Sequence, residues 1–227
     1  MSWKTAHRSF YYQGAPEPPD PELVRDQTAL LCIDVQNYGM VLHEDPVERE
    51  RWAPFHSRMR GTVIPRLKAL QDRFRAEGLD VIHARIACQL EDGRDRSLSQ
   101  KMPGWNNLLM PRDTEASQII PELAPAPGEI VVTKTTDSAL TGTNLRLLLS
   151  NMGIRTVIVT GIYTDQCVSS TVRSLADESF QVILVEDCCA AGTDALHEQE
   201  LAIINMIYCH VMSSAELLKL MRMPATA

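Results

Sequence analysis

The segment at residues 156–162 reads TVIVTGI, and Cys167 follows it in the stretch YTDQC. This run of apolar and β-branched residues predicts a buried strand that turns sharply at Gly161. Cys167 then falls in the first turn of the helix predicted to follow. Unpaired N–H groups and the positive end of the helix dipole favour a thiolate at such a position. The sequence therefore makes Cys167 a candidate nucleophile rather than a core residue.

Strands and helices alternate on both sides of this segment. The βαβ alternation predicts a parallel sheet with helices on both faces, and right-handed crossovers make it a three-layer α/β/α, doubly wound fold. Further strands are predicted at residues 29–34 (ALLCID), 79–85 (LDVIHAR), 129–134 (EIVVTK) and 181–186 (QVILVE), with a short sixth strand at 208–212. Helices are predicted at 62–77, 143–152 and 194–207, after Cys167, and from Ser214 onward.

Two segments stand outside this alternation. Residues 1–27 are rich in proline and contain no apolar run, so we expect an arm on the surface or on a neighbouring subunit rather than a signal peptide or an anchor. Residues 28–227 form one predicted domain. Within it, residues 86–128 are polar and contain proline, which is typical of a lid or binding loop.

The composition argues against several classes of partner. The chain of 227 residues has a net charge of -7, whereas nucleic acids and membrane surfaces attract basic patches. No stretch approaches the roughly 20 apolar residues of a membrane span, so we expect a cytoplasmic protein. The six cysteines fit neither a zinc module nor a disulfide framework, and the histidines lack ligand spacing. The sequence predicts no metal and no cofactor.

Three polar residues stand at the ends of three predicted strands. Asp34 closes the first strand, Lys134 closes the third, and Cys167 follows the fourth. In doubly wound sheets, ligands bind at the carboxyl ends of the strands near the switch point of strand order, so we expect these side chains in one crevice. Together they make a workable nucleophilic set, in which the acid takes the thiol proton, the ammonium stabilises the anions and the sulfur attacks a carbonyl.

The motifs around these residues resemble those of the isochorismatase-like cysteine hydrolases. They read LLCIDVQN at 30–37, VVTKTTDSALTGTNL at 131–145 and VTGIYTDQCVSSTVRSLADESF at 159–180, and the resemblance runs from Thr28 to Leu217. It implies a six-stranded parallel sheet and an Asp–Lys–Cys triad. It also implies a cis peptide bond between Ile162 and Tyr163, and an oxyanion hole formed by the backbone N–H groups of Tyr163 and Cys167.

The resemblance also narrows the activity. Family members that carry the cysteine are amidohydrolases, so Cys167 argues against isochorismatase itself. The nicotinamidase branch has a metal site built from an aspartate and spaced histidines, but the region here, HARIACQLEDGRDRS, holds His83 alone. Residues 161–191 are most similar to biuret and triuret hydrolases, with ureidoacrylate and N-carbamoylsarcosine amidohydrolases as the alternative. We expect a small, neutral, urea-like or carbamoylated substrate and a homo-oligomer, with a tetramer favoured.

Several side chains are candidates for the pocket. Asn37, Trp105 and Tyr208 are candidate substrate-binding residues, although each also fits a surface or packing role. In biuret-type enzymes a pocket glutamine lies near the last strand, where this chain has Tyr208 and neighbouring residues. Gln36 is expected to have a structural role in the first loop.

Two other readings of the same residues stay open. Residues 167–174, CVSSTVRS, match the C-x5-R-[ST] pattern of phosphatase loops, but the stretch has no glycine and suits a helix. On a helix, Arg173 lies about 120° around from Cys167, so it would not share a phosphate with the sulfur. A non-enzymatic reading, in which the chain is a degenerate hydrolase that acts as a scaffold, predicts that Cys167 does not react with iodoacetamide at neutral pH.

Overall fold

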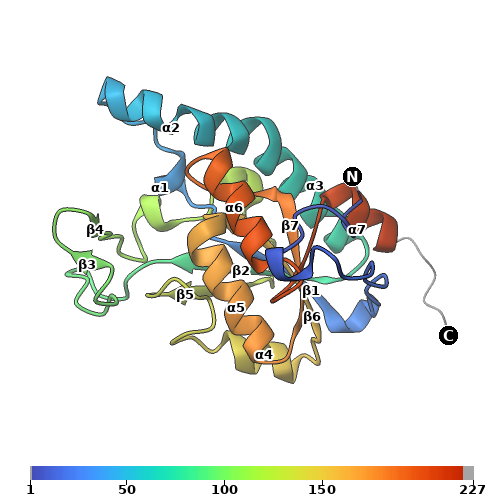
Figure 1. The fold of residues 1–227 in the computed structure, drawn as a ribbon. Coiled ribbons are helices and arrows are strands. Elements are labelled where there is room, and N and C mark those ends of the chain that lie inside the picture. Colours follow the sequence, from blue (N-terminus) through green and yellow to red (C-terminus); the bar gives the residue numbers. More distant parts are fainter. Residues whose placement is uncertain (1, 222–227) are drawn as a thin grey trace.

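A six-stranded parallel sheet forms the centre of the fold, in the order β5-β2-β1-β6-β7-β8 (Figure 1). The structure is a computed structural model of the chain and describes residues 2–221. The end of the predicted domain, residues 222–227, lies outside the described part. The strands are β1 (Thr28–Ile33), β2 (Asp80–Ile86), β5 (Ile130–Lys134), β6 (Thr156–Ile162), β7 (Gln181–Ala190) and β8 (His210–Met212).

The remaining elements surround this sheet. The α-helices are α1 (Asn37–Met40), α2 (Pro46–Arg58), α3 (Ile64–Ala76), α4 (Leu145–Asn151), α5 (Ser169–Asp177), α6 (Asp194–Ile204) and α7 (Ser214–Met221). Two π-helical turns, η3 (Met59–Val63) and η6 (Thr164–Val168), and four short 3₁₀ turns, η1 (Phe10–Tyr12), η2 (Arg25–Gln27), η4 (Glu115–Ser117) and η5 (Pro121–Leu123), join them. A two-stranded hairpin, β3 (Lys101–Met102) and β4 (Asn106–Asn107), completes the described chain.

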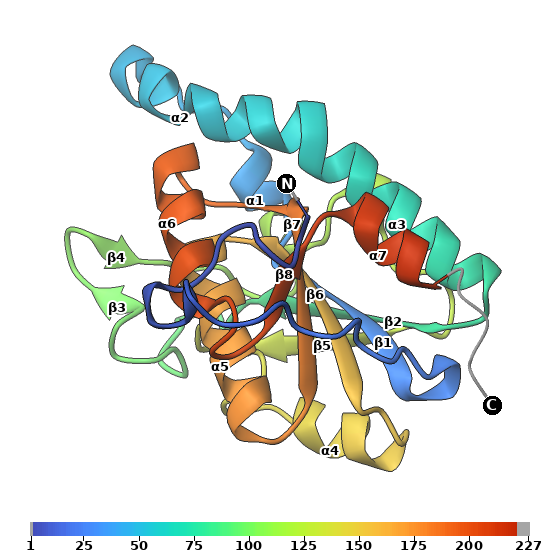
Figure 2. The same ribbon diagram turned by 45° about the vertical axis from the view of Figure 1, so that its right-hand side comes forward.

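Helices cover both faces of the sheet, which confirms the predicted three layers. Helices α2, α3 and α7 lie on one face, and α4, α5 and α6 lie on the other (Figures 1 and 2). Each face of the sheet packs against its helices in a separate hydrophobic core, and successive residues of β1 point into opposite cores. Leu30 packs in the core beneath α2, α3 and α7, and Leu31 packs in the core beneath α4, α5 and α6. Because every residue of β1 is buried, the strand reads as a continuous apolar run, as expected at the centre of a parallel sheet.

One long helix was missed from the sequence. We predicted no helix before residue 62, but α2, η3 and α3 follow one another as a nearly continuous rod whose first end extends beyond the body in both views (Figures 1 and 2). The segment of α2, PVERERWAPFHSR, has five charged residues among its 13 and shows no clear apolar stripe. Its start is fixed locally, because Oδ1 of Asp45 accepts a hydrogen bond of 2.7 Å from the N–H of Val47.

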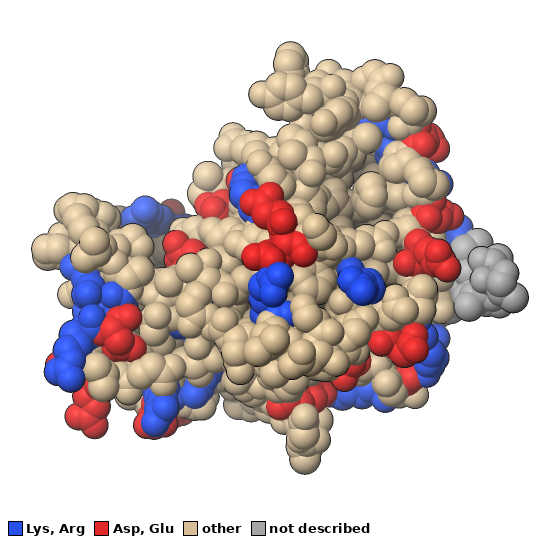
Figure 3. Space-filling view, turned by 90° about the horizontal axis from the view of Figure 1, so that it is seen from below, with Lys and Arg blue, Asp and Glu red and all other residues tan. Residues whose placement is uncertain are grey.

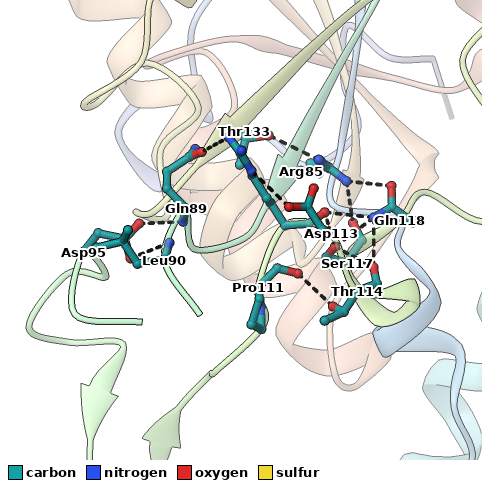
Figure 4. A network of polar contacts seen from close by, with 11 residues as sticks. Arg85, Gln89, Leu90, Asp95, Pro111, Asp113, Thr114, Ser117, Gln118 and Thr133 are labelled. Atoms are coloured by element: carbon teal, nitrogen blue, oxygen red, sulfur yellow. Dashed lines mark hydrogen bonds and ion pairs between the residues drawn. The ribbon is translucent and has the colours of Figure 1, made fainter. Parts of the chain in front are cut away.

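The inserted segment 86–128 is held to the sheet by polar contacts at its base (Figure 4). Arg85, near the end of β2, donates from Nη1 to Oε1 of Gln118 over 2.7 Å and from Nε to Oγ1 of Thr133 over 3.3 Å. At the other side of this base, the N–H of Gln89 donates to Oδ2 of Asp95 over 2.6 Å. The bond from Arg85 to Gln118 thus joins the insertion to β2, and the bond from Gln89 to Asp95 joins two residues within the insertion. The β3–β4 hairpin projects from the body (Figures 1 and 2).

The start of the N-terminal arm packs on its own subunit. The N–H of Trp3 donates to Oε1 of Glu216 over 2.8 Å, and the buried ring of Trp3 meets His210 edge-on at 5.3 Å. Further along, Nδ2 of Asn205 donates to the carbonyl of His7 over 3.0 Å. The first residues of the arm are therefore part of the folded body, as one of the two predicted arrangements required.

Charged side chains of both signs are mixed over the surface. On the face shown in Figure 3, Lys and Arg side chains lie beside Asp and Glu, and neither sign forms a continuous area. Surface ion pairs of this kind include Lys68 with Asp72 at 2.6 Å and Arg94 with Asp92 at 3.0 Å. Among residues 2–221, no helix is both long and apolar enough to cross a membrane.

Gly161 leaves no space for a side chain between β6 and β1. Its φ is +116°, and a Cβ atom built there would overlap the backbone carbonyl of Ile33, its partner in β1. We expect Gly161→Ala to lower the free energy of unfolding by more than about 3 kcal/mol, because it combines backbone strain with a clash that cannot relax. Urea unfolding followed by circular dichroism measures this change.

A matched control for this prediction is Gly61→Ala in η3. A Cβ atom at Gly61 would have no neighbour within 4 Å, so we expect unchanged or slightly higher stability, by about 0.5 kcal/mol. Equal unfolding curves for the two variants would contradict the close packing of β1 against β6.

Candidate active site

Asp34, Lys134 and Cys167 meet at the carboxyl end of the sheet. Asp34 directly follows β1, Lys134 is the last residue of β5, and Cys167 lies in η6, the turn after β6. Nζ of Lys134 lies 2.7 Å from Oδ2 of Asp34 and 3.3 Å from Sγ of Cys167. The ammonium group thus contacts both the carboxylate and the sulfur, next to the β1–β6 switch point of strand order.

The backbone around each residue explains this convergence. Asp34 adopts a left-handed conformation (φ 54°), which aspartate tolerates better than most residues, and this turns the chain out of the sheet. Its N–H still donates to the carbonyl of Ala84 over 2.8 Å. Lys134 is buried along its whole side chain, and Nζ also donates to the carbonyl of Thr136 over 3.1 Å. The ammonium group is thereby held in one position.

Burial and neighbouring charges perturb all three groups. Burial raises the pKa of Asp34, although the charge of Lys134 opposes it. Burial acts to lower the pKa of Lys134, but the charges of Asp34 and Cys167 outweigh it and raise that pKa. Burial and the charge of Asp34 raise the pKa of Cys167 well above its usual value, against the opposing effect of Lys134. The raised pKa of Cys167 favours a neutral thiol, and the raised pKa of Lys134 favours the ammonium form beside it.

Cys167 lies in the π-helical turn that runs directly into α5, which is the first turn of the helix after β6, as predicted. It is only 7% exposed, and this burial opposes the thiolate that the helix terminus favours. The loss of hydration and the adjacent Asp34 carboxylate disfavour a second negative charge there. The thiol consequently needs a base to remove its proton when a substrate is bound.

A cavity of about 440 Å³ opens onto the sulfur. Asp34 and Cys167 line its inner part, together with Ile162 and Tyr163 of the segment before the nucleophile. The insertion also contributes residues to the wall, and its role as a binding loop stays a prediction. Its contributions are the side chains of Gln100, Trp105, Asn106, Leu108 and Met110.

The structure brings only some of the other predicted residues to this cavity. Tyr163 and Trp105 line it, and the peptide bond between Ile162 and Tyr163 is cis, as the family resemblance implied. Asn37 is not part of the lining, because Nδ2 donates instead to the carbonyl of Glu115 over 2.9 Å. Tyr208 is also elsewhere, with its ring under the guanidinium of Arg173 at 5.2 Å. Among the substrate-binding candidates, only Trp105 remains.

Gln36 has the structural role that was expected. Its Nε2 donates to the carbonyls of Ile86 and Ser117 over 2.9 and 2.8 Å, and its Oε1 accepts from the N–H of Ile86 over 2.9 Å. The side chain thus joins the loop after β1 to the end of β2 and to the insertion. Although it lines the cavity, its amide group is already occupied by these bonds.

The phosphatase-type reading of residues 167–174 does not agree with the structure. This stretch runs from η6 into the α5 helix and does not wrap around a cradle of N–H groups. Arg173 points away from the sulfur, with Nη2 2.9 Å from Oε1 of Glu200 and its guanidinium over Tyr208. No arginine among the cavity-lining residues of the described chain can therefore act with Cys167 on a phosphate.

Two acidic residues of the cavity were not recognised from the sequence. Asp137 lies three positions after Lys134, with Oδ1 3.9 Å from Sγ of Cys167 and 3.4 Å from Nε2 of Gln100. Asp165 lies two positions before Cys167 and also lines the cavity. Their proximity in sequence to the triad was a usable signal, but only the folded loops show that both carboxyl groups face the same space.

A buried hydrogen-bond network supports the nucleophile loop from behind. Nδ1 of His197, on α6, lies 2.8 Å from Oγ1 of Thr164, three residues before the nucleophile. Its Nε2 lies 2.8 Å from Nη2 of Arg58, at the end of α2. Because the guanidinium can only donate, Nε2 must accept and Nδ1–H must donate to Thr164. Burial, followed by the charge of Arg58, lowers the pKa of His197 to about 3.

This network predicts a pH effect on stability. The pKa of His197 falls from 6.5 to about 3 on folding, so its contribution is complete above pH 6.5 and is lost as the pH falls toward 3. Between pH 7 and pH 5 we expect a loss of about 2 kcal/mol from this residue, which His197→Gln should remove. Urea unfolding of both proteins at the two pH values measures the difference. Equal losses would show that His197 is not held neutral.

Comparisons with known proteins agree with this architecture. A family model described as the isochorismatase domain matches residues 28–216. An isochorismatase family protein of Desulfovibrio vulgaris has a solved structure that superimposes with a TM-score of 0.71 at 27% identity, covering 87% of this chain and 99% of that one. The family match spans all six strands of the sheet and includes Asp34, Lys134 and Cys167.

Two relatives carry names that describe an activity. N-carbamoylsarcosine amidase of an Arthrobacter species is 33% identical over 135 residues, which is 58% of this chain and 50% of that protein. The match therefore spans about half the length of that relative. Ureidoacrylate amidohydrolase RutB of Methylorubrum extorquens is 29% identical over 208 residues, or 85% of this chain and 82% of that protein. Both names denote hydrolysis of a carbon–nitrogen bond.

Proposed function

This chain belongs to the isochorismatase family of hydrolases that act on carbon–nitrogen bonds, and we propose that it cleaves a small ureido or carbamoyl compound through a cysteine nucleophile. One observation carries the mechanism: Nζ of Lys134 contacts both Oδ2 of Asp34 and Sγ of Cys167 at the inner end of a cavity. A buried acid, a fixed cation and a thiol in mutual reach form a nucleophilic site.

The first half-reaction uses Asp34 as a base. Asp34 takes the proton of Cys167 as the sulfur attacks the carbonyl carbon, and burial, which raises the pKa of Asp34, makes its carboxylate a stronger base than an exposed one. The backbone N–H groups of Tyr163 and Cys167 donate to the oxyanion. Asp34 then returns the proton to the leaving nitrogen, the C–N bond breaks, and ammonia or an amine departs from a thioester.

The second half-reaction releases the acid product. Water loses its proton to Asp34 while its oxygen attacks the thioester carbon, and the C–S bond then breaks. Asp34 returns the proton to the sulfur, which restores the neutral thiol. Lys134 keeps a positive charge next to both groups throughout, so that neither the carboxylate nor the transient thiolate is left uncompensated.

The relatives bear on the substrate. Their names describe ureidoacrylate and N-carbamoylsarcosine, so this class has more support than the biuret or triuret reading favoured by the sequence motifs. Both compounds contain the carbamoyl group, H₂N–CO–N. We therefore propose this group, rather than one particular compound, as what the enzyme recognises and cleaves. A cytoplasmic location, a tetramer and the domain limits 28–227 remain predictions from the sequence.

Ammonia release from a defined panel tests this proposal. The panel contains biuret, triuret, ureidoacrylate, N-carbamoylsarcosine and nicotinamide, the last being an amide without a ureido nitrogen. We expect turnover of at least one ureido compound and none of nicotinamide. Turnover of nicotinamide alone would contradict the proposal, and no turnover together with an iodoacetamide-resistant Cys167 would favour the scaffold reading.

A further inference from the structure

We propose that this active site selects substrates without a carboxylate, and that Asp137 and Asp165 carry the selection. The inference rests on the proposed function, because it concerns the substrate of the same cavity. In it, the two acids repel an anionic substrate and accept hydrogen bonds from the N–H groups of a neutral or cationic one.

The charged residues of the cavity wall are the first observation that supports this selection. Its acidic residues are Asp34, Asp137 and Asp165, and among the described lining residues there is no Arg, Lys or His. Lys134 lies behind the wall and is paired with Asp34 at 2.7 Å, so these two charges offset each other. The wall of the cavity that faces a substrate therefore has a net negative charge, which comes from Asp137 and Asp165.

Asp137 lies next to the reacting atom. Its Oδ1 is 3.9 Å from Sγ of Cys167 and 3.4 Å from Nε2 of Gln100, and its side chain is exposed to the cavity mouth. A compound whose carbonyl reaches the sulfur therefore lies close to this carboxylate. A neutral ureido group can donate an N–H to it, whereas a carboxylate can only accept hydrogen bonds and meets a like charge.

Asp165, two residues before the nucleophile, supplies an independent observation. Its Oδ1 is buried and has no hydrogen-bond partner within the described chain. Buried acceptors without a partner are rare, because the lost hydration is not replaced. Burial raises the pKa of this carboxyl group, against the hydrogen bond from its own backbone N–H, and so acts against its negative charge. Asp165 nevertheless adds a second acidic residue to the wall of the cavity, and no cation of the described chain pairs with it.

This selection separates the chain from its named relatives. Ureidoacrylate and N-carbamoylsarcosine each carry a carboxylate besides the carbamoyl group, and here that carboxylate would find no cationic partner on the described wall. Two like charges a few ångströms apart change binding by about fivefold in water and by several hundredfold in a partly buried site. The effect is therefore large enough to decide between substrates that share the same scissile group.

Alkylation of Cys167 tests the selection without knowledge of the substrate. Iodoacetamide is neutral and iodoacetate is anionic, and both transfer a two-carbon group to sulfur with loss of iodide. We expect the rate ratio of iodoacetamide to iodoacetate at Cys167 to exceed that of free cysteine by at least about tenfold. Mass spectrometry assigns the modified residue, and Cys167→Ser shows whether any of the other five cysteines reacts.

Two variants test the origin of this rate ratio, and a third serves as their control. Asp137→Asn and Asp165→Asn should each reduce the ratio by about fivefold or more, mainly through faster reaction with iodoacetate. Asp92→Asn removes an exposed carboxylate of the inserted segment 86–128, where it pairs with Arg94 and does not line the cavity, and should leave the ratio unchanged. A wild-type ratio equal to that of free cysteine, or a ratio unaffected by both cavity variants, would overturn the proposal.

A substrate pair extends the test to catalysis. N-carbamoylsarcosine and its primary amide differ in charge but share the ureido group, so kcat/KM for ammonia release from that group compares charge alone. We expect the amide to be favoured by at least about tenfold, and the preference to shrink in Asp137→Asn. Preference for the anion would overturn the selection. If neither compound reacts but the alkylation ratio behaves as expected, the charge selection stands and the ureido assignment fails.

Discussion

Cys167→Ser is expected to abolish amide hydrolysis, with kcat reduced by at least about 10⁴-fold. Serine keeps the size of the side chain, but its hydroxyl is far less acidic than a thiol and is not deprotonated by a carboxylate at this site. Steady-state ammonia release with the best substrate of the ureido panel measures the loss. Because the volume hardly changes, circular dichroism and thermal unfolding should resemble those of the wild type.

The control for this experiment is Cys209→Ala. Cys209 is also a buried free thiol, but it does not line the cavity. We expect this variant to lose about 1 kcal/mol of stability through the small void and to keep its turnover number. If Cys167→Ser retained more than a few per cent of wild-type activity, the covalent mechanism would be wrong and direct attack by water would have to replace it.

Lys134→Met is expected to damage both stability and activity. Its ammonium is buried and lies within 2.7 Å of Asp34, so removal leaves a carboxylate in the interior without its counter-charge. We expect the free energy of unfolding to fall by about 3 kcal/mol and kcat/KM to fall by at least about 100-fold. Urea unfolding and ammonia release measure the two effects on the same preparation.

The double variant Asp34→Asn with Lys134→Met separates these effects. It removes both charges, so we expect it to recover much of the lost stability, because no unpaired ion remains in the interior. Activity should not return, since the base that accepts the thiol proton is also gone. A double variant that is no more stable than Lys134→Met would contradict the ion pair, and activity within tenfold of wild type in Lys134→Met would contradict the role of its charge.

Strands were easier to predict than helices in this chain. In β1 and β6 every residue is buried, so the sequence shows an uninterrupted apolar run of the right length. Helix α2 left no such signal, because its apolar residues form no stripe and only Phe55 and His56 are buried. The hairpin β3–β4 was also missed, because strands of two residues are too short for an apolar period.

The candidate triad could be predicted from the positions of its residues at strand ends, whereas the residues that line the cavity could not. Asp34, Lys134 and Cys167 each lie at or just after the end of a parallel strand, and such ends share one edge of a sheet. Asn37 and Tyr208 lie close to strand ends as well, but local hydrogen bonding and stacking place them elsewhere. Loop side chains depend on contacts that the spacing of residues in the sequence does not report.

The sequence by itself determined the family, the parallel sheet and the three residues at its carboxyl end, because apolar runs and strand-end positions are local patterns. Only the tertiary structure decided the charge state of the site. It buries Cys167 beside Asp34, which raises the pKa of the thiol, and it brings Asp137 and Asp165 to the same cavity. Both results depend on hydration and on distances between charges from separate elements, which exist only once the chain has folded.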